Sequence, residues 1–297
     1  MKNIIVSGAN GFIGKNIFKT LIKRGYNVTV LLRHECKELL DMGCMVYTSI
    51  PEKIPEQVYD VFYHLAWAGA GGAARSDTDI QLSNVKSTLE YYRFAEKIKC
   101  KKFIAIGTIA QKTLEVNNAK FLSNTFVYAA TKNYTKTLLE IISRNSSCQF
   151  IWATLCGIYG VGDSTNNIIN YALKGILHNQ SVEFGPANNL FDFVYIDDVI
   201  EALILLGESE LREQSYQIGS GEPRLLSEYL SIIGRCLEKE ELIQIGVRPD
   251  DGIRYPKEWF DISPLIRDTG YENKISFDEG ILKTIKWIRD NEGENCE

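Results

Sequence analysis

Three glycines near the N-terminus constrain the fold of this chain more than any other feature. Gly8, Gly11 and Gly14 follow the apolar run at residues 4–6 and open a helical pattern at residues 11–24. Missing side chains permit a tight turn, close approach of an anion to the backbone and close packing of helix on strand. Free amides and the dipole at the start of a helix favour a pyrophosphate. The spacing G-x-x-G-x-x-G therefore predicts a dinucleotide-binding turn, rather than a turn that is rich in glycine for packing alone.

Short β-rich runs alternate with helical patterns through the first half of the chain. Such alternation is typical of a parallel sheet covered by helices on both faces. We therefore predict an α/β fold with a doubly wound parallel (Rossmann) sheet in residues 1–160. After residue 160 the alternation weakens, and we expect residues 161–297 to form mainly a smaller mixed α/β substrate-binding domain, with residues 191–218 returning to the first domain. The predicted strands are residues 4–6, 28–32, 61–65, 103–106 and 150–155, and the predicted helices are residues 11–24, 81–97 and 128–143.

Composition and charge exclude several classes of protein. A net charge of −5 gives no general attraction to nucleic acid. The seven cysteines are odd in number and contain no C-x-x-C, which favours a reducing compartment. The three histidines are scattered, so we expect no metal site. No apolar run is long enough for a signal-peptide core or a membrane span. We expect a cytoplasmic protein that binds neither nucleic acid nor membranes.

The end of the second predicted strand bears on the choice of cofactor. Dinucleotide folds that select NAD often place an acidic residue there, to hold the ribose 2′-hydroxyl, whereas an arginine meets the 2′-phosphate of NADP. This chain has Arg33 at that position. We therefore expect NADP, with NAD possible. The alternative is a surface arginine beside a loop.

Tyr128 and Lys132 are four residues apart, so on a helix they share a face. A free tyrosine has a pKa of about 10, too high for proton transfer at neutral pH. An ammonium at about 4 Å would lower the pKa of the phenol by up to about three units. Thr108 follows the apolar strand at residues 103–106 and Gly107. It therefore lies at the carboxyl end of a strand, where ligands bind in such sheets. Thr108 would hydrogen-bond the substrate oxygen that Tyr128 protonates, or it only caps the strand.

At these residues the chain resembles the extended short-chain dehydrogenase/reductases, in particular the nucleotide-sugar epimerase/dehydratase/reductase group. The resemblance extends over nearly the whole chain. Its motifs are the glycine turn, residues 60–66 (like the family's D-hhhHLA strand), Asn84-Val85 with Thr88 (like N-V-x-G-T), residues 158–160 (like N-V-Y-G) and residues 192–199 (like R-D-F-V-H-V-D-D).

The resemblance implies a role for each matching position. It makes Thr108, Tyr128 and Lys132 the catalytic triad, and it implies a nucleotide-diphosphate sugar as substrate and a homodimer. His64 lies within a strand and is expected to be a packed core histidine. The expected cofactor-binding residues are Gly8, Asn10, Gly11, Phe12, Ile13, Gly14, Arg33, Leu65, Ala66, Asn84, Tyr128 and Lys132, and the expected substrate-binding residues are Trp67, Thr108, Gly157, Arg248 and Arg254.

Departures from the family pattern reduce the number of reactions that the chain is expected to catalyse. Phe191 replaces the arginine before D-F-V, and Gly157 and Thr154 replace an asparagine and an arginine, so sugar recognition differs here. The Asp-Glu pair of the 4,6-dehydratases is replaced by Ile109-Ala110, which leaves no acid or base for water elimination. We therefore expect reduction of a 4-keto-6-deoxy nucleotide sugar at C4. An NAD-dependent 4-epimerase is the alternative within the family, and a non-catalytic NADP-binding sensor is the alternative outside it.

Overall fold

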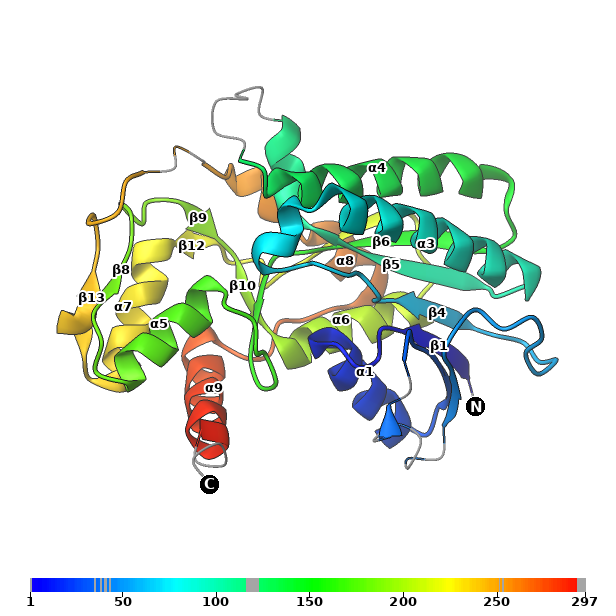
Figure 1. The fold of residues 1–297 in the computed structure, drawn as a ribbon, viewed down its shortest axis with the longest axis horizontal. Helices are drawn as coiled ribbons and strands as arrows, with labels where there is room; N and C mark the ends of the chain where they lie inside the picture. Colours follow the sequence, from blue (N-terminus) through cyan, green and yellow to red (C-terminus); the bar gives the residue numbers. More distant parts are fainter. Residues whose placement is uncertain are drawn as a thin grey trace.

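The centre of the molecule is a parallel β-sheet. The computed structural model describes residues 2–34, 36, 37, 39, 42, 44–115, 123–250, 252 and 254–292. Within these ranges seven parallel strands lie in the order β11-β6-β5-β4-β1-β2-β3 (Figure 1). This order confirms the predicted doubly wound sheet. The strands are β1 (Asn3–Ser7), β2 (Asn27–Leu31), β3 (Met45–Tyr47), β4 (Val61–His64), β5 (Lys102–Thr108), β6 (Gln149–Leu155) and β11 (Ser215–Ile218).

Helices cover both faces of the sheet because successive side chains of each strand point to opposite sides. Ile4 and Val6 of β1 belong to one buried cluster, and Ile5 between them belongs to the other. Figure 1 shows α3 and α4 on one face and α1 and α6 on the other. These helices are α1 (Phe12–Lys23), α3 (Thr78–Lys97), α4 (Phe126–Ile142) and α6 (Ile196–Glu208).

The carboxyl-terminal part consists of short strand pairs and helices beside the carboxyl edge of the sheet (Figure 1). Two of the pairs are parallel, β7 with β10 and β8 with β13, and the pair of β9 with β12 is antiparallel. The remaining elements are β7 (Gly157–Tyr159), α5 (Ile168–Leu177), β8 (Val182–Glu183), β9 (Leu190–Phe191), β10 (Phe193–Tyr195), β12 (Arg224–Leu225), α7 (Leu226–Leu237), β13 (Ile243–Gln244), α8 (Ser263–Thr269) and α9 (Phe277–Glu292), with short 3-10 turns η1 (Gly72–Ser76), η2 (Ile109–Glu115), η4 (Ser143–Asn145), η5 (Glu240–Leu242) and η6 (Lys257–Phe260).

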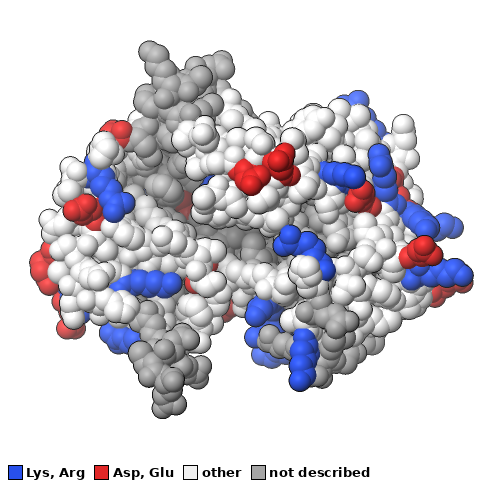
Figure 2. All heavy atoms as spheres, in the orientation of Figure 1, with Lys and Arg blue, Asp and Glu red and all other residues white. Residues whose placement is uncertain are grey.

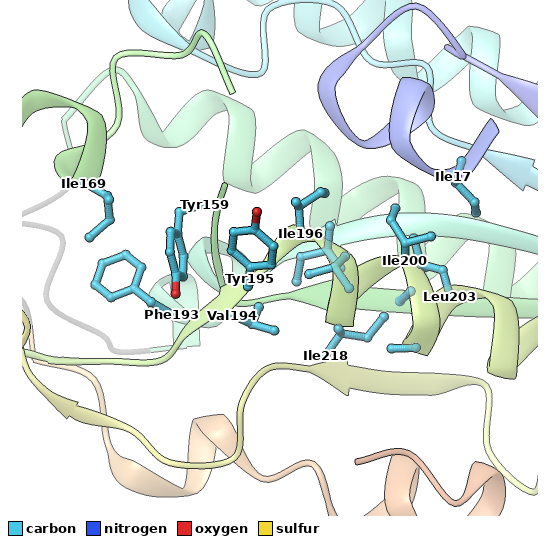
Figure 3. Packing of buried hydrophobic residues seen from close by; sticks show 14 of the residues in the cluster. Ile17, Tyr159, Ile169, Phe193, Val194, Tyr195, Ile196, Ile200, Leu203 and Ile218 are labelled. Carbon is cyan, nitrogen blue, oxygen red and sulfur yellow. The ribbon is translucent and has the colours of Figure 1, made fainter. Parts of the chain in front are cut away.

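One hydrophobic cluster joins the two parts. Figure 3 shows Ile17 of α1 and Ile200 of α6 in the same packed layer as Tyr159 and Phe193. The Tyr159 ring lies 5.1 Å from Phe277 at the start of α9, centroid to centroid, and its hydroxyl donates to the Phe277 carbonyl. The apolar area shared by the two parts opposes their separation, because it would be exposed to water.

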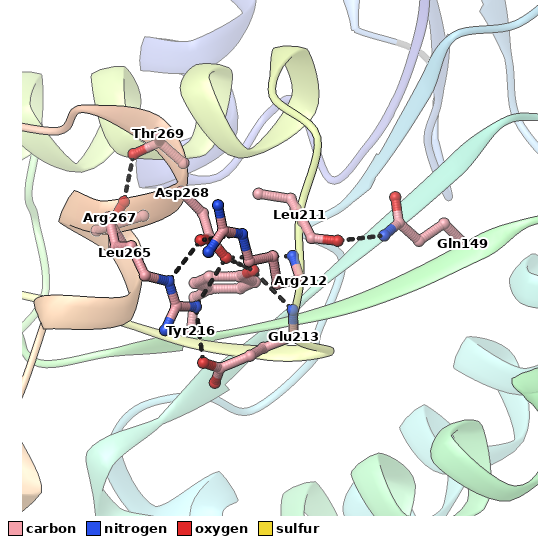
Figure 4. A network of polar contacts seen from close by, with 9 residues as sticks. All are labelled: Gln149, Leu211, Arg212, Glu213, Tyr216, Leu265, Arg267, Asp268 and Thr269. Atoms are coloured by element: carbon pink, nitrogen blue, oxygen red, sulfur yellow. Dashed lines mark hydrogen bonds and ion pairs between the residues drawn. The ribbon is translucent and has the colours of Figure 1, made fainter.

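A polar network fixes α8 to the edge strand β11 (Figure 4). The Asp268 carboxylate accepts hydrogen bonds from the Tyr216 hydroxyl at 2.6 Å and from Nε of Arg267 at 2.7 Å. The hydrogen bond from Arg267 holds the pKa of Asp268 well below its usual range. Because the carboxylate stays ionised, this anchor persists across the neutral pH range.

The predicted elements differ from the structure mainly at their ends and at the two edge strands, β3 and β11, neither of which was among the predicted strands. The strand predicted at residues 103–106 extends to Lys102 and Thr108, and the helix predicted from residue 81 begins at Thr78. The sequence pattern did not reveal β3, whose three residues are half-buried at the edge of the sheet. Three half-buried residues give no clear alternation, so an edge strand of this length has little signal.

Candidate active site

The glycine turn lies at the carboxyl end of β1, in the middle of the sheet. Gly8 has a φ of +75°, and a Cβ there would lie 2.7 Å from the Ala66 amide nitrogen. A Cβ at Gly14 would lie 2.0 Å from the Gly8 carbonyl oxygen. Both positions therefore need glycine, Gly8 for its backbone conformation and Gly14 for the packing of α1 on β1. Gly11 is less crowded, since its Cβ would lie 3.4 Å from the same oxygen.

The start of α1 is open to an anion. Gly11 is the N-cap, so no side chain caps the first amides, and the first turn contains no acidic residue. These amides and the helix dipole face a cavity of about 210 Å³. The residues present fit a dinucleotide, because the cavity joins the glycine turn to the ends of β2 and β4. It is lined by Gly8, Asn10, Gly11, Leu31, Leu32, Arg33, His34, Leu65, Ala66, Trp67, Ala68, Asn84, Ser87 and Tyr91.

Thr108 and Tyr128 meet at the carboxyl end of β5. Thr108 is the last residue of that strand, and Tyr128 is buried in the first turn of α4. The Thr108 hydroxyl is near enough to the Tyr128 phenol to influence its ionisation. Burial raises the pKa of Tyr128, whereas the Arg75 guanidinium and the Thr108 hydroxyl lower it. The structure thus brings together the predicted proton donor and the predicted hydroxyl partner.

Lys132 is one turn further along α4, but its ammonium is directed away from the phenol. Its Nζ donates to the Ile106 carbonyl at 2.6 Å and lies 3.7 Å from the centroid of the Trp67 ring. Burial lowers the pKa of Lys132 well below its usual value. The expectation that Lys132 lowers the pKa of Tyr128 is therefore wrong for this structure. A shared helix face did not fix the direction of a long side chain, and the backbone carbonyl and the indole ring hold the ammonium elsewhere.

The loop between β4 and α3 packs against Tyr128 through Trp67 and Arg75. Trp67 was among the site residues predicted from the sequence, but Arg75 was not. The guanidinium of Arg75, in η1, lies 4.5 Å from the centroid of the Tyr128 ring. The Trp67 ring stands edge-on to the same tyrosine at a centroid distance of 6.2 Å. A signal was available, since Arg75 is the one charged residue between His64 and Asp77.

Two buried amides on α3 hold this loop in place. Gln81 accepts a hydrogen bond from the Trp67 indole at 2.9 Å. Its amide nitrogen donates to the carbonyls of Gly69 and Ala74, at 2.8 and 2.9 Å. Asn84 pairs with both backbone groups of Ala68, at 2.8 and 2.9 Å. Asn84 thus lines the cavity and fastens the loop at the same time.

His64 has a structural role. Its Nδ1 lies 2.8 Å from the Ser7 hydroxyl, and its Nε2 lies 3.0 Å from the Thr88 hydroxyl. Thr88 donates its own proton to the Asn84 carbonyl, so Nε2 carries the proton and Nδ1 accepts from Ser7. Burial lowers the pKa of His64 to about 3. The ring is neutral at physiological pH, which confirms the expected packed histidine.

A second cavity of about 580 Å³ lies in the carboxyl-terminal part. Arg248 lines it, donating from Nη2 to the Tyr171 hydroxyl at 2.8 Å. Arg254 does not line it but donates to Asn189 and Asp250 at its margin, at 2.9 and 3.0 Å. The lining residues are Asn166, Asn167, Ile168, Tyr171, Glu183, Phe184, Gly185, Pro186, Ala187, Asn188, Asn189, Phe191, Leu226, Arg248, Pro249 and Asp250.

Gly157, Phe12, Ile13 and Gly14 do not line either of these two cavities. A Cβ at Gly157 would lie 2.5 Å from the Phe193 ring, so packing accounts for this glycine. Phe12, Ile13 and Gly14 form the first turn of α1 behind the glycine turn. They offer a ligand their backbone amides rather than their side chains.

The geometry of the glycine turn and of the Tyr128 site agrees with a comparison with known families. The model of the NAD dependent epimerase/dehydratase family matches residues 4–219. The chain belongs to this family. It is an enzyme of the extended short-chain dehydrogenase/reductase type, among the NAD-dependent nucleotide-sugar epimerases, dehydratases and reductases.

Members of this family with different activities are similar to the chain over almost its full length. CDP-abequose synthase from Salmonella muenchen is 24% identical over 292 residues, which are 96% of this chain and 97% of the relative. The dTDP-4-dehydro-6-deoxyglucose reductase of Escherichia coli is 23% identical over 310 residues, 96% and 97% of the two chains. The structure of UDP-glucose 4-epimerase from Thermotoga maritima matches with a TM-score of 0.76 at 21% identity, covering 97% and 99%.

Three further features of the structure concern membrane-spanning helices, metal-binding clusters and the charges on the surface. Among the helices of the described residues, none has the length and hydrophobicity required to cross a membrane. No group of three or more His, Cys, Asp or Glu side chains in the same ranges is placed to hold a metal ion. On the face that Figure 2 shows, Lys and Arg side chains are interspersed with Asp and Glu, and the surface is hollowed between the two halves of the molecule.

Proposed function

We propose that this enzyme reduces a 4-keto-6-deoxy nucleotide sugar at C4 with NADPH. The proximity of Thr108 and Tyr128 at the carboxyl end of β5 carries the proposal, because it sets a proton donor near a second hydroxyl. Ile109 and Ala110, which follow Thr108 in η2, have no acid or base for water elimination. Incubation with 4-keto-6-deoxy nucleotide sugars tests this, and NADPH should be oxidised in proportion to the sugar reduced.

The 210 Å³ cavity would hold the dinucleotide. The amides at the start of α1 would bind its pyrophosphate, and Lys132 would hold the nicotinamide ribose. Bound there, NADPH supplies the hydride. Because the ring of Trp67 now covers the Lys132 ammonium at 3.7 Å, that ring would move aside or stack on the ligand when the ribose arrives.

The side chains of the chain then handle the proton and the carbonyl. Thr108 donates a hydrogen bond to the 4-keto oxygen and keeps it beside Tyr128. As the carbonyl carbon gains hydride, its oxygen becomes an alkoxide and takes the proton from the Tyr128 hydroxyl. The phenolate that remains is reprotonated from water between turnovers.

The 580 Å³ cavity would bind the nucleotide part of the substrate. Arg248, which lines that cavity, is placed to pair with the diphosphate, and Arg254 is held next to it by Asp250. The names of two relatives, a CDP-abequose synthase and a dTDP-4-dehydro-6-deoxyglucose reductase, support a nucleotide deoxysugar. Residues 161–297 would then be mainly the substrate domain, with residues 191–218 belonging to the dinucleotide domain through the pairing of β11 with β6.

Arg33→Asp is expected to weaken binding of NADPH far more than binding of NADH. Arg33 is exposed at the end of β2 and lines the dinucleotide cavity, where a carboxylate would repel a 2′-phosphate and accept a hydrogen bond from a 2′-hydroxyl. Titration calorimetry with both cofactors measures the ratio of affinities. Arg289→Asp on α9 makes the same charge change far from the cavity and should leave the ratio unaltered. Equal weakening of both cofactors by Arg33→Asp would remove Arg33 from the site.

We also propose a homodimer that packs α3 and α4 against their copies. Leu82 of α3 and Tyr134 and Ile141 of α4 are each more than half exposed, at 55%, 55% and 53%. Large apolar side chains on two adjacent helices form a surface suited to a partner. Sedimentation of the purified chain should give twice the mass of 33.6 kDa, and a monomer at micromolar concentration would refute the dimer. A cytoplasmic location is part of the same proposal.

A further inference from the structure

Arg75 lies beside Tyr128, the proposed acid, but has no role in the reaction proposed above. Its guanidinium lies over the face of the Tyr128 ring, 4.5 Å from the centroid. Its Nε is buried and donates no hydrogen bond within the described part of the chain. A buried guanidinium nitrogen without an acceptor is unfavourable unless a negative charge forms nearby. The neighbouring group in which a negative charge forms during the proposed reaction is the Tyr128 phenol.

The loop that carries Arg75 is fixed on both sides of it. Gln81, which is fully buried, donates to the carbonyl of Ala74 at 2.9 Å. The amide of Asp77 donates to the same carbonyl at 3.3 Å, and the Asp77 carboxylate accepts from the Ile80 amide and so caps α3. These bonds hold the backbone on both sides of Arg75 against α3, and the half-buried Arg75 side chain extends from this fixed backbone over the Tyr128 ring.

The charged and polar groups around Tyr128 come from four elements. Thr108 of β5 lies near its hydroxyl, and Arg75 of η1 lies over its ring. Lys132 is on the same helix, and its ammonium donates to the Ile106 carbonyl and lies over the Trp67 ring. Lys112 of η2, which also packs on α4, donates to the Trp259 carbonyl at 2.9 Å. Arg75 is thus the cation that directly faces the phenol ring.

We propose that Arg75 is a positioning residue for the proton transfer, whose guanidinium stabilises the phenolate left when Tyr128 gives its proton to the substrate alkoxide. The negative charge of a phenolate spreads into its ring, so a cation over the ring face gains attraction as the proton leaves. Burial raises the pKa of Tyr128, and Arg75 and Thr108 lower it. This inference rests on the proposed role of Tyr128 as the acid.

The direct test measures the ionisation of Tyr128 itself. Protein labelled with fluorotyrosine, whose phenols all ionise at lower pH, gives one fluorine NMR signal for each tyrosine, and Tyr128→Phe identifies the signal of interest. Arg75→Gln is expected to raise the pKa of Tyr128 by about one unit or more. Arg75→Lys, which keeps the charge, should raise it less. Lys283→Gln removes a cation that lies 5.5 Å from the ring of Tyr195 and should leave Tyr128 unchanged.

Kinetics provide the second readout. In the reducing direction, Arg75→Gln should lower kcat by about threefold to tenfold, because the acid is weaker, and should move the alkaline limb of the pH profile upward. The KM for the sugar should change little. An unchanged pKa of Tyr128 in folded Arg75→Gln would overturn the proposal. If the KM for the sugar also rose, Arg75 would be a substrate ligand instead. Full activity of Tyr128→Phe would instead overturn the proposed function, whatever the NMR titration gives.

Discussion

Tyr128→Phe is expected to lower kcat by about 100- to 10,000-fold while leaving the affinity for the cofactor unchanged. The substitution removes only the hydroxyl that gives its proton to the alkoxide. The edge contact with Trp67 and the contact with the Arg75 guanidinium belong to the ring, which phenylalanine keeps. Because phenylalanine keeps the buried ring and its packing, the variant should fold.

Steady-state turnover of NADPH and calorimetric titration of the cofactor together check this expectation. Tyr134→Phe is the matched control, since Tyr134 is on the same helix with 55% of its side chain exposed. It should keep normal turnover. Near-normal activity of Tyr128→Phe would show that another group is the acid, and a parallel loss in both variants would indicate a general effect on α4.

Lys132→Met should abolish most turnover, by about 100-fold or more, and should also weaken the cofactor. The variant removes the ammonium that would hold the nicotinamide ribose. Its stability should change little, because two effects oppose each other. The substitution relieves a buried charge whose pKa is lowered by burial. It also leaves the Ile106 carbonyl without its 2.6 Å hydrogen bond, which costs about 1–3 kcal/mol.

Thermal unfolding, cofactor titration and turnover separate these contributions for Lys132→Met. Lys136→Met is the control, because Lys136 lies one turn along α4 and forms an ion pair with Glu140 at 3.6 Å. That control should retain cofactor binding and turnover. If Lys132→Met bound NADPH with normal affinity, the ribose contact would be absent and the lysine would serve packing alone.

The sheet and the glycine turn could be predicted because their signals are local. Buried strands such as Gln149–Leu155 contain a run of apolar residues, here residues 150–153. Gly14 has to be glycine because the strand and the helix pack so closely there. Thr108 and Tyr128 could be assigned to one site because ligands lie at the carboxyl ends of parallel strands, where Thr108 ends its strand, and because the family resemblance puts both residues in the catalytic triad. The Met45–Tyr47 strand gave no such signal because it is short and half-buried.

The electrostatics of the site could not be predicted from spacing. A spacing of four residues puts Tyr128 and Lys132 on one helix face, but the Ile106 carbonyl and the Trp67 ring determine where the ammonium lies. The position of Arg75 depends on hydrogen bonds that Gln81 makes to carbonyls across the loop. Such contacts join residues whose types show no pattern along the chain. The sequence therefore shows Arg75 as the one charged residue of its loop, but not its position over Tyr128.

The transfer of deuterium from labelled NADPH to the sugar tests the proposed reduction most directly. The enzyme is incubated with 4-keto-6-deoxy nucleotide sugars carrying cytidine, thymidine or uridine, and with NADPH that holds deuterium at its transferable position. We expect label at sugar carbon 4 in a single stereoisomer, with one NADPH oxidised for each sugar reduced. Interconversion of two 4-epimeric sugars without added NADPH and without gain of label would contradict the reductase and establish the epimerase.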